Sequence, residues 1–271
     1  MKYQGEPKPI EYDPLTRAAL EAQPELGPVH FQVSSGSHAK TNLLLNQHTS
    51  AEPVRYETLL PSELWGCARV LSQYFGRLNE IAVSKTTWEL SGKAYPEEEL
   101  TASSRLLRTE KRKGLSFALV ETTTSTVSGT PLLKQLDELL LYHQAQEGWR
   151  YQEREVPDLE PFETSIPRTV YFRHSWNPEI WKNNIHTDEY ARKWGYHQAL
   201  PEFIMYLDWI FDAVYRQEQE KAFASQLDLP LILPVYEGDS ITVRLQRLEQ
   251  GFVVRLVKGE VTRLRGKVRL L

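Results

Sequence analysis

Cysteine is almost absent from this chain of 271 residues, in which Cys67 is the only one. A single cysteine excludes an intramolecular disulfide, as is typical of proteins that work in a reducing cytoplasm. The opening stretch "MKYQGEPKPIEYDP" has no apolar core, so we expect no signal peptide there. From these two absences the sequence predicts a cytoplasmic location.

A surplus of basic charge and long apolar runs are also lacking. The formal net charge is -4 and the isoelectric point is about 6.0, so no basic excess is there to neutralise nucleic-acid phosphates. The longest apolar-rich run lies near 203–215, and Asp208 and Asp212 interrupt it. It is too short and too polar to span a membrane. We therefore expect no nucleic-acid partner and no membrane span.

Three common catalytic signatures are missing. The sequence has no His, Cys and Asp spacing that resembles a zinc site. It has no glycine-rich phosphate loop and no serine nucleophile elbow. We therefore expect no metal and no other cofactor. Aromatic residues, in contrast, are plentiful, with 7 Trp, 13 Tyr and 9 Phe, and they suit either a packed core or a pocket for a long or flat apolar ligand.

The chain repeats itself weakly at a spacing of about 140 residues. "VHFQVSS" from Val29 falls on "VYFRHSW" from Val170, and "LLPSELW" around Pro61 falls on "ALPEFIM" around Pro201. "AYPEEELTA" then falls on "VYEGDSITV" at nearly the same spacing. Matches in the same order predict two units of similar plan.

The repeat divides the chain into four expected segments. An N-terminal extension (1–27) precedes a first unit (28–145), and a second unit (166–271) closes the chain. The segment between them, 146–165, is polar and contains proline, as linkers do.

Both units are expected to follow one order of elements. A short strand (29–33 and 170–174) leads into an irregular polar stretch, then a helix with proline in its first turn, then antiparallel strands. Alternating residues from Asp239 onward predict a meander with one solvent-exposed face. In the first unit we expect the helix at 61–75 and strands near 82–90, 98–109, 115–127 and 131–142.

One long helix per unit, enclosed by an antiparallel sheet long enough to curl around it, describes a hot-dog fold. Two such units in tandem make a double hot dog, whose sheets join edge to edge and so cover edge strands that would otherwise be exposed. We therefore predict an α+β protein with a tandem (double) hot-dog fold.

The stretch "NNIHTDEYARKWGY" (183–196) places a histidine, an aspartate and two asparagines ahead of Tyr-Ala and Gly-Tyr. It resembles the signature of MaoC-like (R)-specific enoyl-thioester hydratases and dehydratases, which show Asp-x-Asn-Pro-Ile-His before the same pairs. The first unit is similar to the degenerate N-terminal hot dog of two-unit members. The residues that match the signature are Asn183, Ile185, His186, Tyr190, Ala191, Gly195 and Tyr196.

Two positions depart from the family pattern. Trp181 stands where the family has its catalytic aspartate, and Asn184 stands where it has proline. "FRHSW" (172–176) and "NNIHTD" (183–188) look closer to a double hot-dog branch that reads Asn-x-His-Arg-Ile-His-Tyr-Asp after Arg-x-Ser. In that comparison Asn183 replaces a histidine. The identity of the second acid/base group is therefore open.

The resemblance implies the addition of water to a 2-enoyl thioester, or its removal from a 3-hydroxyacyl thioester. One histidine and a second acid/base group suit the two proton transfers. A backbone N–H at a helix N-terminus suits the charge that develops on the thioester oxygen, and the helix at Pro201 is placed to supply it. His186 is the predicted base. One site per chain is expected, because Leu45 or Asn46 stands at the His186 position of the first unit.

Several neighbours of His186 are candidates for the remaining roles. Asp188 is a catalytic candidate, with helix capping as its alternative role, and Glu179 lies in a loop that could fold back. Asn183 joins the catalytic set because its amide can orient water. The expected substrate-binding residues are Asn184, Trp181, Trp176, His174 and Pro201.

The predicted function is a hydro-lyase, a hydratase or dehydratase that acts on an acyl group carried by CoA or by an acyl carrier protein. The replaced aspartate favours a specialised biosynthetic pathway. Two alternatives remain: a hot-dog enzyme with another reaction, such as thioester hydrolysis, cyclisation or elimination, and a non-catalytic acyl-binding subunit. The basic run 105–114 would meet substrate phosphates or an acidic carrier, or be a solvated turn. The sequence is compatible with a homodimer.

Overall fold

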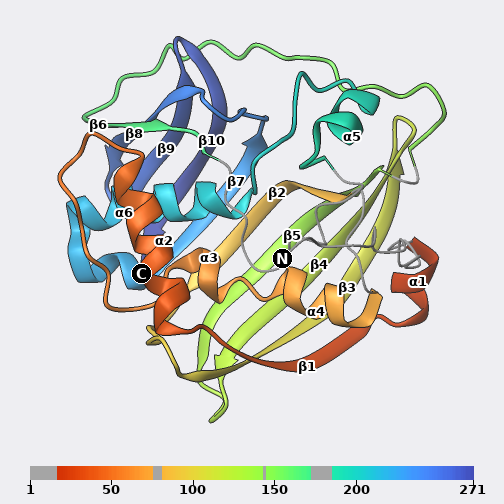
Figure 1. Ribbon diagram of the computed structural model, residues 1–271, viewed down its shortest axis with the longest axis horizontal. Helices are drawn as coiled ribbons and strands as arrows, with labels where there is room; N and C mark the ends of the chain where they lie inside the picture. Colours follow the sequence, from red (N-terminus) through yellow and green to blue (C-terminus); the bar gives the residue numbers. More distant parts are fainter. Residues whose placement is uncertain (1–16, 76–80, 143–144, 172–184) are drawn as a thin grey trace, which may run out of the picture.

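The computed structural model describes residues 17–75, 81–142, 145–171 and 185–271 (Figure 1). Its strands are β1 (Glu25–Gln32), β2 (Ile81–Leu90), β3 (Glu99–Arg112), β4 (Leu115–Thr126), β5 (Pro131–Leu141), β6 (Thr164–Thr169), β7 (Ser225–Ile232), β8 (Ser240–Leu248), β9 (Gly251–Lys258) and β10 (Val261–Leu270). Its helices are α1 (Arg17–Ala22), α2 (Ser35–Gln47), α3 (Pro61–Leu64), α4 (Cys67–Phe75), α5 (Asp188–Lys193), α6 (Ile204–Glu218) and the 3₁₀ helix η2 (Gln219–Phe223).

The strands form one antiparallel sheet in the order β1-β3-β4-β5-β2-β7-β10-β9-β8-β6. The first five belong to one half of the chain and the last five to the other, and β2 pairs with β7 at the joint. Read outward from that joint, the two halves have equivalent strand orders. Figure 1 shows α6 over the half that contains β7 to β10 and α4 over the other half. This arrangement confirms the predicted tandem hot-dog plan.

The opening strand of the second half lies upstream of the predicted one. β6 ends at Thr169, before the expected range 170–174, of which 172–174 lie outside the described residues. The strand pairing explains the difference: Ala102 pairs with Val29, and its counterpart in the repeat, Val243, pairs with Ile166. Val29 therefore corresponds to Ile166, and the repeat spacing changes in this strand.

The helix expected at 61–75 is two helices, α3 and α4, which Trp65 and Gly66 separate. A Cβ atom on Gly66 would lie 2.6 Å from the Cβ of Ala102, so the chain can cross β3 this closely only with glycine. The predicted single helix is therefore wrong at this position.

Helix α2 occupies a stretch that the sequence predicts to be irregular. It begins after Ser34, whose Oγ accepts a hydrogen bond from the Ser37 N–H at 3.1 Å. One of its buried polar residues, Asn42, has a partner beyond α2: its side chain donates to the Tyr56 carbonyl at 3.3 Å and accepts from the Tyr56 N–H at 2.9 Å. Because this partner lies outside α2, the polar sequence of the segment alone wrongly predicts an irregular stretch.

The segment before β6 is packed against the second half of the sheet. The Asp158 carboxylate lies 2.6 Å from Arg244 and 2.8 Å from Arg255, and both Asp158 and Arg255 have buried side chains. Arg255 alternates along β9 with core residues, so it points to the sheet face away from α6. β9 is consequently buried on both faces up to Val257. The predicted solvent-exposed face is wrong for this strand, because the preceding segment covers it.

Helix α6 is buried from Ile204 to Val214, including two aspartates. Asp208 accepts hydrogen bonds from the N–H and the hydroxyl of Ser62, at 3.0 and 2.6 Å, and Ser62 belongs to α3 of the first half. A helix buried on every side must satisfy its polar groups with partners from other elements. Asp208 therefore ties the two halves together.

Asp212, one turn further along α6, interacts with three side chains. It accepts from the Tyr56 hydroxyl at 2.6 Å and from Arg216 at 2.9 Å, and it forms an ion pair with the buried Arg168. Arg168 also donates to the Leu45 carbonyl of α2 at 3.0 Å. One carboxylate thus links α2, β6 and α6.

We predict that Asp212→Asn lowers the free energy of unfolding by about 3 kcal/mol, because it leaves the buried Arg168 without its counter-charge. Urea denaturation measures the change. Asp228→Asn, at an exposed position on β7, is the matched control and should have little effect. Equal stability of the two variants would contradict this account.

His38 of α2 predicts a pH dependence of stability. Its Nδ1 lies 2.8 Å from the Glu63 carboxylate and its Nε2 lies 2.9 Å from the Tyr56 carbonyl. Burial opposes charge on the ring, but the hydrogen bond to Glu63 and the charges of Glu63 and Asp208 outweigh it and raise the pKa of His38. The fold therefore favours the protonated ring.

Because this pKa is raised on folding, the stabilisation is fully present below the unfolded value of about 6.5 and is lost as the pH rises through the folded value. Urea denaturation of the protein and of His38→Gln should give a difference in unfolding free energy that narrows with rising pH. A difference that stays constant with pH would show that folding does not change the pKa of His38, and one that widens with rising pH would show that folding lowers it.

Candidate active site

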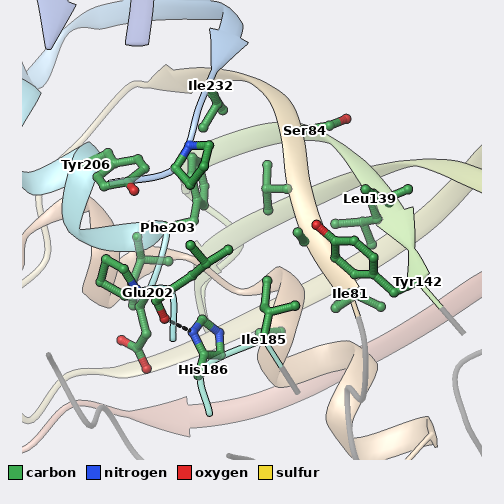
Figure 2. A pocket seen from close by; sticks show the side chains of 18 of the residues that line it. Ile81, Ser84, Leu139, Tyr142, Ile185, His186, Glu202, Phe203, Tyr206 and Ile232 are labelled. Atoms are coloured by element: carbon green, nitrogen blue, oxygen red, sulfur yellow. Dashed lines mark hydrogen bonds between the residues drawn. The ribbon is translucent and has the colours of Figure 1, made fainter. Parts of the chain in front are cut away.

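A cavity of about 280 Å³ lies between the two halves of the molecule (Figure 2). The first half contributes α4, the start of β2 and the end of β5 to its walls. The second half contributes 185–186, the start of α6 and the segment 232–234 at the end of β7. Most of the lining side chains are apolar, so the cavity suits an acyl chain or another apolar group.

His186 lies in the turn before α5 and lines the cavity. The Leu200 N–H donates to the Ile185 carbonyl at 2.8 Å, which holds this turn against the chain before α6. The His186 Nδ1 lies 2.5 Å from the Leu200 carbonyl oxygen. A carbonyl can only accept, so Nδ1 carries the proton, and the lone pair of the neutral ring is on Nε2. This orientation suits the predicted base.

The Tyr-Ala and Gly-Tyr pairs of the motif have structural reasons. Ala191 is fully buried, and its carbonyl accepts from the Tyr196 N–H at 3.0 Å. Gly195 has a φ of +90°, and a Cβ there would lie 2.7 Å from the Tyr151 carbonyl oxygen. This turn needs glycine, and it directs Tyr196 onto the cavity wall.

Asp188 does not line the cavity. Its side chain is 54% exposed, and its carboxylate accepts from the Ala199 N–H at 2.8 Å and from Arg192 at 2.9 Å. Thr187 is the N-cap, so Asp188 is the first residue of α5. The predicted alternative role of Asp188 as the N-cap is therefore wrong: its carboxylate joins the first turn of α5 to Arg192 and to the Ala199 N–H. The catalytic role of Asp188 stays a prediction.

Pro201 lines the cavity together with the next three residues. The residue at the N-cap of α6 is Phe203, so Pro201 lies before the first helical turn and not within it as expected. The N-terminus of α6 nevertheless faces the cavity, where its dipole and N–H groups favour negative charge.

The sequence predicts six further residues for the site or as its alternative acid. They lie outside the described residues, and their roles stay predictions: His174, Trp176, Trp181, Asn183 and Asn184, together with the alternative acid Glu179.

The sequence did not point to Glu202, a carboxylate that is only 6% exposed and lines the cavity. Figure 2 shows its side chain near His186 at one end of the cavity. Its one signal in the sequence was its place beside Pro201 in the repeat segment "ALPEFIM", where the first half has Ser62. The repeat shows that Glu202 and Ser62 are equivalent in sequence, but it does not show that the Glu202 side chain is buried.

An aromatic wall forms the end of the cavity near Tyr142. The hydroxyls of Tyr142 and Tyr196 are hydrogen-bonded to each other, and the Tyr151 ring stacks on Tyr196 with centroids 4.5 Å apart. Burial raises the pKa of all three phenols, that of Tyr151 to about 12. They therefore keep their protons near neutral pH.

Cys67 lines the cavity from α4, above the fully buried Asp137. The Asp137 carboxylate accepts from the Trp65 indole at 2.9 Å and from the Thr86 hydroxyl at 2.5 Å, and burial raises its pKa to about 6. Burial, and then the charge of Asp137, raise the pKa of the Cys67 thiol. A thiol that stays protonated is a poor nucleophile.

We predict that Cys67 in the folded protein reacts with iodoacetamide at about pH 8 at least about 100-fold more slowly than a free cysteine, because it is buried and protonated. Mass spectrometry measures the labelled fraction. The chain unfolded in guanidinium is the control and should label fully at this one cysteine. Fast labelling of the folded protein would contradict the assigned environment.

Among residues 17–75, 81–142, 145–171 and 185–271, no group of His, Cys, Asp and Glu side chains is arranged to hold a metal ion. In the same part of the chain, no helix combines the length and apolarity that a membrane crossing requires.

No protein-family model matches the sequence, and no curated protein matches it at a significant level. Solved structures do match. The peroxisomal multifunctional enzyme type 2 of Drosophila melanogaster aligns with a TM-score of 0.67 at 14% identity over 91% of this chain. The chain spans 48% of the length of that enzyme.

Two further structures show the same likeness. A MaoC-like dehydratase from Phytophthora capsici aligns with a TM-score of 0.54 at 14% identity, over 70% of this chain and 72% of its own. An acyl-ACP thioesterase from Bacteroides thetaiotaomicron aligns with a TM-score of 0.53 at 13% identity, over 90% of this chain and 97% of its own. The protein therefore has a MaoC-like double hot-dog fold.

Proposed function

We propose that the protein is a hydratase or dehydratase that acts on a 2-enoyl or 3-hydroxyacyl thioester. The observation that carries this proposal is the setting of His186, which lines an apolar cavity and is oriented by the Leu200 carbonyl. The likeness to a MaoC-like dehydratase supports the reaction class. The likeness to an acyl-ACP thioesterase supports an acyl-thioester substrate.

The cavity would hold the acyl chain, and Nε2 of His186 would move one of the two protons. In the dehydration direction it removes the proton on Cα, which the thioester carbonyl makes weakly acidic. Negative charge then develops on the thioester oxygen, and the N-terminus of α6 is placed to stabilise it. The apolar walls exclude bulk water and so strengthen this interaction.

One site per chain follows from the same arrangement. The motif belongs to the second half, and the first half contributes walls to the cavity through α4, β2 and β5. In this proposal the residues that stay predictions, among them Asn183, Asn184 and Trp181, complete the binding of the thioester. The carrier is either CoA or an acyl carrier protein, and both deserve assay.

We predict that the purified protein consumes crotonyl-CoA or a longer 2-enoyl thioester, and that His186→Ala lowers kcat/KM by about 100-fold or more, because a positioned acid/base group contributes that much. Loss of enoyl absorbance measures turnover. His30→Ala is the matched control, since His30 is exposed on β1 and is not among the residues that line the cavity.

Three results would overturn this proposal in different ways. Full activity of His186→Ala would remove the base assignment. Release of free thiol without loss of the double bond would indicate a thioesterase. Activity only after addition of a second protein would indicate a non-catalytic acyl-binding subunit.

A further inference from the structure

The proposed reaction needs a second proton-transfer group, and the described cavity lining offers few. Its side chains that can ionise are His186, Glu202, Cys67 and four tyrosines, Tyr142, Tyr151, Tyr196 and Tyr206. Burial raises the pKa of the thiol and of all four phenols, so these groups hold their protons at neutral pH. Within the described lining, only the imidazole and the carboxylate are suited to exchange protons there.

We propose that Glu202 is the second catalytic acid/base group of this site, in place of the aspartate whose position in the family signature is Trp181. This inference rests on the proposed hydratase or dehydratase function. Glu202 lines the same cavity as His186 and is only 6% exposed. A buried carboxyl group is costly to maintain, and such groups in clefts gather at functional sites.

The chain fixes Glu202 and His186 through one short segment. The Leu200 carbonyl that orients the His186 ring lies two residues before Glu202. The Glu202 carbonyl in turn accepts from the Met205 N–H at the first turn of α6. The helix dipole at this end stabilises the ionised carboxylate, which is the form that acts as a base in the hydration direction. Both groups are therefore positioned by the start of α6.

The first half supports the assignment by contrast. Ser62 stands at the repeat position of Glu202, and it donates to Asp208 of α6 instead of lining the cavity. Neither the histidine nor the carboxylate of the site has a counterpart in the first half. This agrees with one pair of acid/base groups per chain.

The two groups account for every proton of the reaction. In dehydration, Nε2 of His186 takes the Cα proton, and the C–H electron pair forms the enolate of the thioester. These electrons then form the Cα–Cβ double bond while the Cβ–O bond breaks. The leaving hydroxyl takes the proton of the Glu202 carboxyl group and departs as water. His186 ends protonated and Glu202 ionised, and one proton exchanged through solvent restores both; hydration is the reverse.

The test compares Glu202→Gln, Glu202→Asp and the exposed control Glu237→Gln on the enoyl thioester that the protein turns over. For Glu202→Gln we expect kcat to fall by about 100-fold or more with little change in KM, and one limb of the pH–rate profile to disappear. Glu202→Asp should keep both limbs at a reduced rate. Thermal unfolding of all variants shows whether a loss of rate reflects loss of the fold.

The outcomes separate this inference from the proposed function. A Glu202→Gln rate within about threefold of the parent, with both limbs intact, overturns the role of Glu202 while a dead His186→Ala keeps the function. Loss of turnover in Asp188→Asn with an unaffected Glu202→Gln would assign the second role to Asp188 instead. Absence of turnover by the parent protein on every enoyl thioester tried would overturn the function, and the role of Glu202 with it.

Discussion

The buried carboxylates of Asp208 and Asp212 hold the two halves of the molecule around α6. Asp208 binds the start of α3 through Ser62, and Asp212 binds Tyr56 and Arg168. Residues directly after α3, beginning with Trp65, line the cavity from the first half, and residues directly before α6 line it from the second. The contacts of Asp208 and Asp212 fix both the chain after α3 and the chain before α6. The shape of the cavity therefore depends on these two side chains of α6.

The sequence predicted those parts of the fold that depend on local patterns. The strands of the first half and the helix α6 after Pro201 appear close to where the sequence pattern places them. Helix α2 and the position of β6 were missed, because they depend on partners distant in the chain. Two buried polar residues of α2, His38 and Asn42, are satisfied by Glu63 and Tyr56. The repeat could not reveal the displaced β6, since only the pairing of Val243 with Ile166 fixes its register.

In the candidate site, too, local sequence predicted some residues, and others depend on segments that are distant in the chain. A contiguous motif was enough to predict His186, and its ring does line the cavity. Proximity in sequence also suggested Asp188, but α5 begins at that residue and turns its carboxylate toward Arg192 and the Ala199 N–H. Glu202 was not predicted, because the neighbouring sequence does not distinguish a carboxylate that lines a cavity from an exposed one. Only the return of the chain from α5 to α6 brings it to the cavity that the histidine lines.

The comparison of Glu202 with Ser62 explains why a repeated fold has one site. Both residues follow the proline that precedes a helix in their own half. In the first half this position is Ser62, which donates two hydrogen bonds to the buried carboxylate of Asp208 in α6. A buried carboxylate is costly without such hydrogen bonds. A cavity carboxylate at position 62 would face Asp208 and repel it. The contact between Ser62 and Asp208 therefore excludes a second cavity carboxylate at position 62. The first half instead contributes walls to the cavity that contains His186 and Glu202.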